Sequence, residues 1–300
     1  MKLEYIVDKK HINKTIKDIC LSYFKISHRL LITLKKNECF YINDKKAYVY
    51  NKVNQNDKVT IDLNYEEESE NIVPNKNIPL DIIYEDEWLL ILNKNASIPI
   101  HPSINHFEDS LSNGIKYYFD SINLKKKIRI VNRLDKDTSG LVIVAKCEYV
   151  QEELIKQMKE NIFSKEYIAI VEGFLNNKEG TINKPIARKK DSIIERCIDE
   201  NGDISITKYN VIKELEINNK KDRKNYKVSI VNCKLLTGRT HQIRVHFSSI
   251  GHPLLGDDLY GGNKDLFSRQ ALHSYKISFI HPITNKKEEF ISNLPKEFNI

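Results

Sequence analysis

The chain has 300 residues, of which 40% are hydrophobic and 30% charged, with a formal net charge of +7. This length allows one substantial core and a small additional domain. No apolar run approaches the roughly 18 residues of a membrane helix, and the N-terminus lacks an apolar signal core, so we expect a cytoplasmic protein. Five scattered cysteines without a Cys-x-x-Cys pair exclude a disulfide framework and a zinc site as first interpretations.

Most of the positive charge lies in residues 1–63, which hold 13 Lys and Arg against 7 Asp and Glu, a net +6. Apolar residues at helical spacing predict a short amphipathic helix over 12–23. A second helix is expected to follow Ser27 as its N-cap and to stop at Asn37. These two helices open a small basic unit.

The rest of this unit is predicted to be a small sheet. Residues 39–50 alternate around an Asn43-Asp44 turn, and KVTIDL should form a further strand that ends near Leu63. A compact α/β domain over residues 1–63 results. Its concentrated charge favours phosphate contacts with RNA, although a solvated lysine-rich surface is the simpler alternative.

Residues 64–79 read NYEEESENIVPNKNIP and contain four glutamates and two prolines. Such a composition is typical of a solvated linker, so we place the domain boundary there. A second domain is expected over residues 80–300.

This second domain is predicted to be rich in strands and to belong to the α+β class, because its helices are too few for regular β-α alternation. Gly251 should end its last helix in a left-handed conformation. The predicted strands are 80–94, 141–146, 167–173, 181–186, 203–215, 226–236, 273–282 and 286–292, and the predicted helices are 148–160 and 238–251.

The densest cluster of unusual residue choices is VNRLDKDTSGLVIVAK at 131–146, where Arg133, Asp135, Lys136 and Asp137 crowd the entry to an apolar strand. A turn at such a place can present a carboxylate rigidly, and Asp135 is our candidate. The alternative is a charged loop in which Asp135 or Asp137 caps a turn. Arg244, on the predicted helix at 238–251, could pair with Asp135 and hold it ionised, although it could also be a surface arginine.

These residues resemble the RluA family of RNA pseudouridine synthases. VNRLDKDTSGL is similar to the family's RLD-x-x-TSGL signature, and other blocks match in the same order. They are LNKNASIPIHP (92–102), SKEYIAIVEG (164–173), LLTGRTHQIRVHF (235–247), GHPLLGDDLYGG (251–262) and RQALHSYKISFIHP (269–282). Residues 12–63 resemble the small RNA-binding domain named after ribosomal protein S-four, which often precedes these enzymes.

The resemblance implies a mixed, largely antiparallel central sheet with flanking helices, and a role for each matched residue. Asp135 corresponds to the essential aspartate, Tyr167 to the tyrosine that packs on the target base, and Arg244 to the arginine that pairs with the aspartate. Further matched positions are expected to support the loop, the pocket or the RNA backbone: Lys94, Arg133, Thr138, Ser139, Gly140, Lys165, Gly238, Arg239, His241 and Gln242.

Three positions depart from the family pattern. Asn132 stands where the family usually has histidine, and Asn95 and Ser97 replace a proline and a glycine. Asparagine still donates and accepts hydrogen bonds but does not titrate near neutrality. We expect these changes to affect substrate choice more than activity.

The implied reaction isomerises a uridine in structured RNA and needs no cofactor and no metal. A carboxylate and a dry pocket that retains the detached base are sufficient for it. Because a uridine inside a helix is inaccessible, it must be flipped out, and Tyr167 suits the stacking role. The family resemblance favours large-subunit ribosomal RNA as substrate, with transfer RNA second; no membrane association and no obligate protein partner are indicated.

Other functions fit the sequence less well. An aspartyl-phosphate phosphatase would use the Asp135-x-Asp137 pattern with magnesium, but Asn132 and Arg133 interrupt the strand that should precede it. A glycosidase with two carboxylates would leave Arg244 without a role. The separation of His241 and His246 does not fit a paired-histidine metal motif. A non-catalytic RNA-binding protein would be expected to have lost one of the three catalytic matches.

Overall fold

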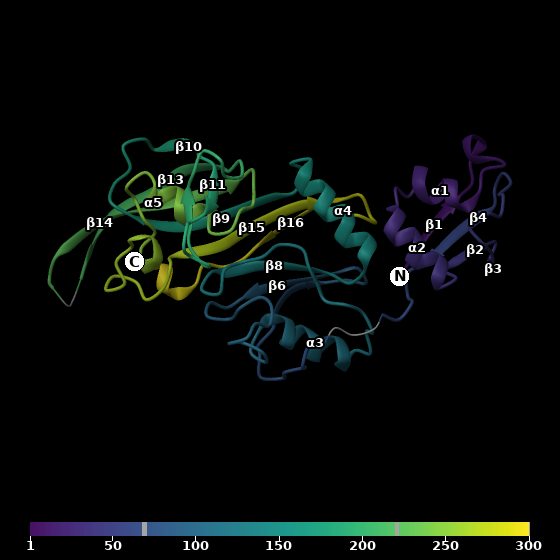
Figure 1. The fold of residues 1–300 in the computed structure, drawn as a ribbon, viewed down its shortest axis with the longest axis horizontal. Coiled ribbons are helices and arrows are strands. Elements are labelled where there is room, and N and C mark those ends of the chain that lie inside the picture. Colours follow the sequence, from purple (N-terminus) through teal and green to yellow (C-terminus); the bar gives the residue numbers. More distant parts are fainter. Residues whose placement is uncertain (68–70, 220–221, 300) are drawn as a thin grey trace.

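A computed structural model describes residues 1–67, 71–219 and 222–299, and Figure 1 shows two bodies joined by a short segment. The small N-terminal body lies at one end of the molecule. At the opposite end, β13 and β14 extend as a long hairpin. Part of the predicted linker, residues 68–70, lies outside the described residues.

The N-terminal body contains a four-stranded antiparallel sheet in the order β1-β4-β2-β3. The first strand was not predicted from the sequence. Asn43 and Asp44 both have positive φ, at 48° and 64°, which is the conformation of a tight hairpin turn. The elements are β1 (Lys2–Ile6), η1 (Lys9–His11), α1 (Ile16–Ser22), α2 (His28–Lys36), β2 (Phe40–Ile42), β3 (Lys45–Lys46) and β4 (Lys58–Asp62).

Helix capping decides where the two N-terminal helices begin. Ser27 accepts a hydrogen bond from the Leu30 amide at 3.1 Å and caps α2, which ends before Asn37 as predicted. The first helix starts later than predicted, because Thr15 and Asp18 form a reciprocal capping box. Residues 12–14 therefore lie outside α1.

The large body is built on a ten-stranded sheet in the order β10-β13-β14-β9-β15-β8-β6-β5, with β7 and β16 paired to β8 and β15. All neighbours are antiparallel except β15 and β8, so the predicted mixed, largely antiparallel α+β fold is confirmed. Its strands are β5 (Asp81–Glu85), β6 (Leu89–Lys94), β7 (Arg129–Ile130), β8 (Ser139–Ala145), β9 (Ser164–Glu172), β10 (Glu179–Asn183), β13 (Ile206–Asn218), β14 (Asn225–Leu235), β15 (Leu272–Ile280) and β16 (Lys287–Ile291).

Helices cover both faces of the sheet near β6 and β8. The two strands are buried on both sides, with alternate residues in two different apolar clusters, which explains their uninterrupted apolar sequences. The remaining elements are α3 (Leu111–Ser121), which was not predicted, α4 (Glu148–Lys159), α5 (Gln242–Ser248), η2 (Asp258–Tyr260), η3 (Lys296–Phe298) and the hairpin β11 (Ile186–Arg188) with β12 (Arg196–Ile198).

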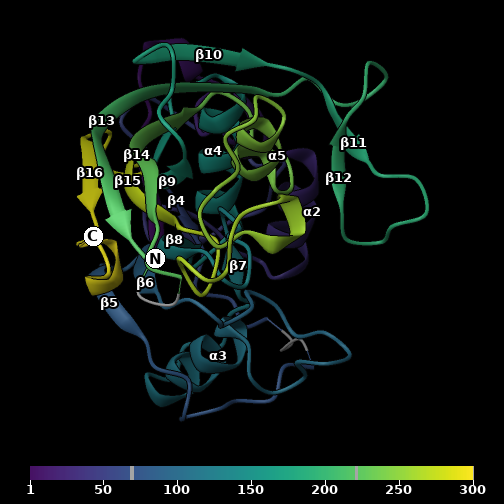
Figure 2. The same ribbon diagram turned by 90° about the vertical axis from the view of Figure 1, so that its left-hand side faces the viewer.

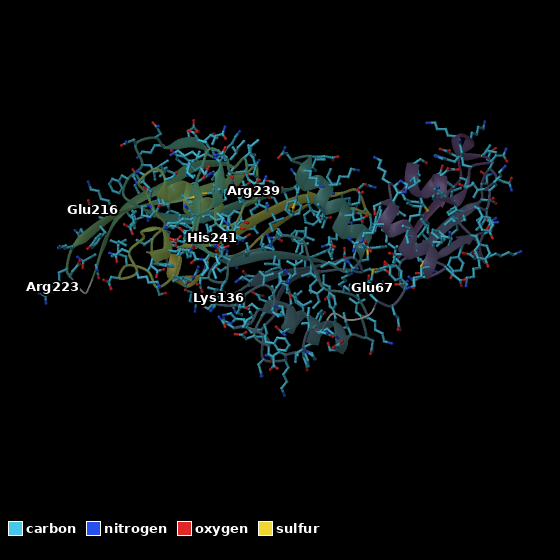
Figure 3. The ribbon with its side chains drawn as sticks, viewed as in Figure 1. Glu67, Lys136, Glu216, Arg223, Arg239 and His241 are labelled. Carbon is cyan, nitrogen blue, oxygen red and sulfur yellow. The ribbon has the colours of Figure 1, made fainter. Side chains whose placement is uncertain are left out.

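The segment after β4 is not a fully solvated linker as predicted. Glu67 forms a bidentate ion pair with Arg129, and both side chains are almost completely buried. The buried ammonium of Lys126 donates to the carbonyls of Leu63 and Tyr65 and lies over the Tyr65 ring. Figure 3 labels Glu67 at this junction between the two bodies. This part of the segment is packed because it supplies partners to buried cations.

A single apolar cluster runs from the core of the N-terminal body to α4 and the near face of the sheet. Ser27, at the start of α2, donates to the carboxylate of Glu152 on α4 at 2.7 Å, and Arg29 pairs with Glu148. In the described part of the chain, no helix is long and apolar enough to cross a bilayer.

Candidate active site

Asp135 lies in the loop between β7 and β8, where the chain turns tightly before the buried strand. The amide of Thr138 donates to the Asp135 carbonyl at 3.1 Å and closes the turn. The carboxylate is one-quarter exposed and faces a pocket lined mainly by this loop, β9 and the start of α5. Its position combines a fixed backbone with an accessible functional group.

The side chain of Lys94 anchors the backbone of this loop. Its ammonium is buried and donates to three backbone carbonyls, those of Asn95, Ile98 and Lys136, each at 2.8 Å. Burial lowers the pKa of Lys94 to about 7, against the opposing charges of Asp137 and Asp135. Lys94 therefore acts on the backbone next to Asp135 rather than on the pocket.

Arg244, on α5, connects two carboxylates. One terminal nitrogen donates to Asp135 Oδ2 at 3.0 Å. Its Nε and its second terminal nitrogen donate to the two carboxylate oxygens of Asp257, at 2.7 and 2.8 Å. Burial alone would lower the pKa of the guanidinium, but the ion pairs with Asp257 and Asp135 raise it, so the arginine stays charged and fixed in direction.

Asp257 is 1% exposed and was not predicted as a site residue. The available signal was the adjacent pair of carboxylates, Asp257 and Asp258, in the Gly-bracketed segment GDDLYGG. From sequence alone, neither residue could be assigned to Arg244.

Tyr167 lies on β9 between β14 and β15, paired with Cys233 and Ser274. Its ring is 5% exposed and lines the same pocket as Asp135 and Arg244. Burial and the nearby Asp135 charge raise the pKa of its hydroxyl. The structure thus brings the three predicted catalytic residues together around one pocket.

His241 adds a fourth group at the pocket. It has a left-handed backbone, with φ of 57°, at the start of α5. Its Nε2 is 3.8 Å from Asp135 Oδ2, and its Nδ1 shares a 2.7 Å hydrogen bond with the Tyr260 hydroxyl. Burial lowers the pKa of the His241 imidazole. Tyr260, which sequence reasoning did not single out, also lies under the Arg244 guanidinium at 5.0 Å.

His246 has a separate environment, bonded to Thr207 Oγ1 and the Lys184 carbonyl at 2.9 and 3.0 Å. Among the described residues, no group of three or more His, Cys, Asp or Glu side chains is arranged to hold a metal ion.

Four other predicted residues support the backbone around the pocket. Gln242 accepts from Thr237 and the Arg239 amide, and fixes the loop before α5. Ser139 bonds to His273 and accepts from Arg269, a buried arginine that was not predicted. Thr138 is buried beside Gln270, at 3.4 Å, and Gly140 has a φ of 108° where β8 meets β15.

The remaining four predicted residues, Arg133, Lys165, Gly238 and Arg239, line the open side of the pocket. Arg133 and Arg239 are exposed, and Figure 3 shows Arg239 near His241 in the middle of the large body. Burial lowers the pKa of Lys165, and a Cβ on Gly238 would come within 3.1 Å of its ammonium.

A basic groove continues from this opening to the β11–β12 hairpin, which projects from the body in Figure 2. Arg133 and Arg239 line both the pocket and this groove, and Arg188 and Arg196 line its hairpin side. The pocket is therefore reached along a surface with four arginines and one acidic residue, Asp203.

The structure accounts for two of the three departures from the family pattern, those at Asn132 and Ser97. Asn132 is buried and bridges to β8, donating to the Leu141 carbonyl and accepting from the Ile143 amide, as a strand backbone would. Ser97 adopts a φ of 65°, a conformation that suits the glycine it replaces. The Asn95 carbonyl is one of the Lys94 acceptors.

The chain is similar to proteins of one family. The model of the RNA pseudouridylate synthase family matches residues 88–249. The uncharacterized RNA pseudouridine synthase YjbO of Bacillus subtilis is 37% identical over 91% of this chain and 93% of its own length. Ribosomal large subunit pseudouridine synthase D of Blochmanniella floridana is 37% identical, over 76% of this chain and 73% of its own.

A solved structure is also similar. Human RNA pseudouridylate synthase domain containing 1 superposes with a TM-score of 0.60 at 28% identity, over 74% of this chain and 86% of that one.

Proposed function

The chain belongs to the RNA pseudouridylate synthase family, and we propose that Asp135 is the nucleophile with which it isomerises a flipped-out uridine of large-subunit ribosomal RNA. The observation that carries this proposal is the 3.0 Å ion pair between Arg244 and Asp135 at a pocket that also contains Tyr167.

The reaction breaks the bond between the ribose C1′ and uracil N1 and forms one between C1′ and C5. The proton on C5 is lost, and N1 gains one, so no redox partner or water is consumed. A carboxylate can add to the nucleoside only when ionised. The hydrogen bond from the Arg244 guanidinium fixes the direction of the Asp135 carboxylate at the pocket.

Tyr167 provides an aromatic wall for the detached base. Its ring is buried among Leu235 and Leu272 on the pocket side, so a uracil there would be shielded from water while it turns. Extraction of the uridine costs a few kcal/mol, which stacking and backbone contacts offset.

The RNA backbone is proposed to follow the basic surface. Arg133 and Arg239 lie at the mouth of the pocket, and Arg188 and Arg196 extend the positive charge along the groove. The N-terminal body, with a net charge of +6 over residues 1–63, would hold a further part of a structured RNA. These contacts position the substrate, whereas the pocket selects the uridine.

The choice of ribosomal RNA follows from relatives named as large-subunit synthases, including those of Blochmanniella floridana and Haemophilus influenzae, the latter 34% identical over 79% of this chain. Transfer RNA is the second candidate and would be distinguished by the same experiment.

The test is to incubate the purified protein with ribosomal RNA or transfer RNA in EDTA and to map pseudouridine by reverse-transcription stops after carbodiimide treatment. Wild type should produce stops on ribosomal RNA. Asp135→Asn should abolish them and keep RNA affinity within about twofold, because the amide retains the shape but cannot act as the nucleophile.

Asp137→Asn is the matched control, since Asp137 lies in the same loop, whereas the carboxylates that pair with Arg244 are those of Asp135 and Asp257. It should retain product formation. Product from Asp135→Asn would remove this residue from the nucleophile role, and stops only on transfer RNA would replace the proposed substrate.

A further inference from the structure

Tyr48 and Tyr50 place two parallel aromatic rings on the surface of the N-terminal body. Their centroids are 5.5 Å apart, the ring planes differ by 7°, and the residues are 50% and 68% exposed. We propose that this pair is a stacking platform for an unpaired base of the RNA substrate. The inference rests on the proposed function in taking RNA to be the substrate, and it assigns a binding site outside the active site.

The backbone that carries the rings is fixed. The Asn51 amide donates to the Tyr48 carbonyl at 2.9 Å, and the Tyr48 amide donates to the Asn51 side chain at 2.6 Å. Two further bonds anchor the turn to the start of α1, from Lys17 N to the Val49 carbonyl and from Ile16 N to the Asn51 carbonyl, at 2.9 and 3.0 Å. Because this backbone is already fixed, less entropy is lost when the rings bind a ligand.

The rings of Tyr48 and Tyr50 are not part of the hydrophobic core. Val49, between them, packs against the main apolar cluster, whereas neither Tyr48 nor Tyr50 belongs to it. Since both residues are at least half exposed, the ring faces that do not stack on each other are left to water, and a nucleobase can stack on such a face whatever its identity. Other exposed apolar side chains of the chain do not form a comparable parallel pair among the described residues.

The surrounding charge favours a nucleic acid over an apolar partner. Lys45 and Lys52 flank the turn and are exposed. Lys46 is also exposed, and it pairs with Glu38. Aromatic rings interleaved with lysines are the usual composition of a single-stranded nucleic-acid site.

The platform lies far from the chemistry. It follows β3, which is at the outer end of the N-terminal body in Figure 1, whereas Lys136 and Arg239 mark the catalytic region in Figure 3. It therefore binds a nucleotide other than the target uridine. Loss of the rings should change RNA affinity and KM but not kcat.

The experiment compares full-length wild type with Tyr48→Ala/Tyr50→Ala and Tyr48→Phe/Tyr50→Phe, and uses Tyr117→Ala as the control. Tyr117 is 46% exposed on α3 in the other body. The probe is a single-stranded RNA with one 2-aminopurine, whose fluorescence falls when the base stacks. The double alanine variant should bind about tenfold more weakly and lose the quenching, with an unchanged salt slope, because no phosphate contact is removed.

The phenylalanine variant should behave like wild type, since it keeps both rings. The proposal is overturned if the double alanine variant binds within about twofold of wild type, or if wild type does not bind the probe. The proposed function has a separate readout. If the enzyme forms pseudouridine but its RNA binding does not depend on the two rings, only the proposed stacking site is refuted. If binding depends on the rings but no pseudouridine forms, only the proposed function is refuted.

Discussion

At the scale of single residues, the site depends on how Arg244 divides its hydrogen bonds. It binds both oxygens of the buried Asp257 but only one oxygen of the accessible Asp135. The second Asp135 oxygen therefore remains available to a substrate. Asp257 orients the arginine, and the arginine orients the proposed nucleophile, so we infer that Asp257 is a positioning residue.

We expect Asp257→Asn to lower the free energy of unfolding by about 3 kcal/mol, because a buried guanidinium loses its charged partner. The Asp257→Asn variant should also have a lower kcat, whereas its KM should change less. Urea unfolding and steady-state kinetics measure both. Asp258→Asn is the neighbouring control: its carboxylate is exposed and pairs with Lys264, so its effect on stability should stay below about 0.5 kcal/mol.

Lys94 gives a second prediction at this scale, on pH. Burial lowers its pKa to about 7 in the folded protein from the ordinary 10.5. Between these values the unfolded state binds more protons, so the free energy of unfolding should rise with pH. From pH 7 to 9, wild type should gain on the order of 2 kcal/mol relative to Lys94→Met, which lacks the titrating group. Parallel curves from urea unfolding at each pH would contradict this.

At the scale of elements, the pairing of β8 with β15 sets the position of the loop that carries Asp135. Gly140 sits at this crossing with a φ of 108°, and a Cβ there would meet the Ser274 carbonyl oxygen at 2.3 Å. Any side chain must separate the two strands. Glycine is therefore required at this position because the two backbones approach closely, and not because it takes part in the chemistry.

We expect Gly140→Ala to cost more than about 2 kcal/mol of stability and to reduce kcat, since the strand shift moves the catalytic loop. Gly251→Ala provides the comparison. It also has a positive φ, 80°, but open space around its Cβ, so it should cost only about 1 kcal/mol. Equal losses for the two variants, measured by thermal unfolding, would show that backbone strain alone accounts for the effect.

Most elements could be predicted from the sequence, because their signals are local. Ser27 as an N-cap, the Asn43-Asp44 turn and the apolar run of β8 all act over a few residues. The partners of Arg244 could not be predicted in full, since pairing with Asp257 depends on how separate loops meet. Asp135 and Arg244 were candidates from their local context, whereas the role of Tyr167 came from the family motif. The helix α3 was not predicted, although its buried apolar residues Leu111, Ile115 and Phe119 recur at helical spacing.

At the scale of the whole molecule, the segment between the two bodies acts as a packed junction. Glu67 neutralises Arg129 beside the buried Lys126, and the N-terminal apolar core continues into the large body through α4. Because these contacts hold the two bodies together, the basic N-terminal surface keeps a defined position relative to the pocket. A structured RNA could be recognised over that fixed span.

The contacts at this junction predict that substitutions of two adjacent glutamates, Glu67 and Glu66, differ in their effect on stability. Glu67→Gln should lower the free energy of unfolding by about 3 kcal/mol, because Arg129 and Lys126 would remain buried with less compensating charge. It should also loosen the docking of the N-terminal body and raise KM for structured RNA. Glu66 pairs with Lys125 at the surface, so Glu66→Gln should change stability by less than about 0.5 kcal/mol. Urea unfolding measures the change in stability, and small-angle scattering measures whether the N-terminal body is less tightly docked. If both variants keep wild-type stability and dimensions, the apolar contacts with α4 suffice to hold the bodies together, and the Glu67–Arg129 pair does not fix their arrangement.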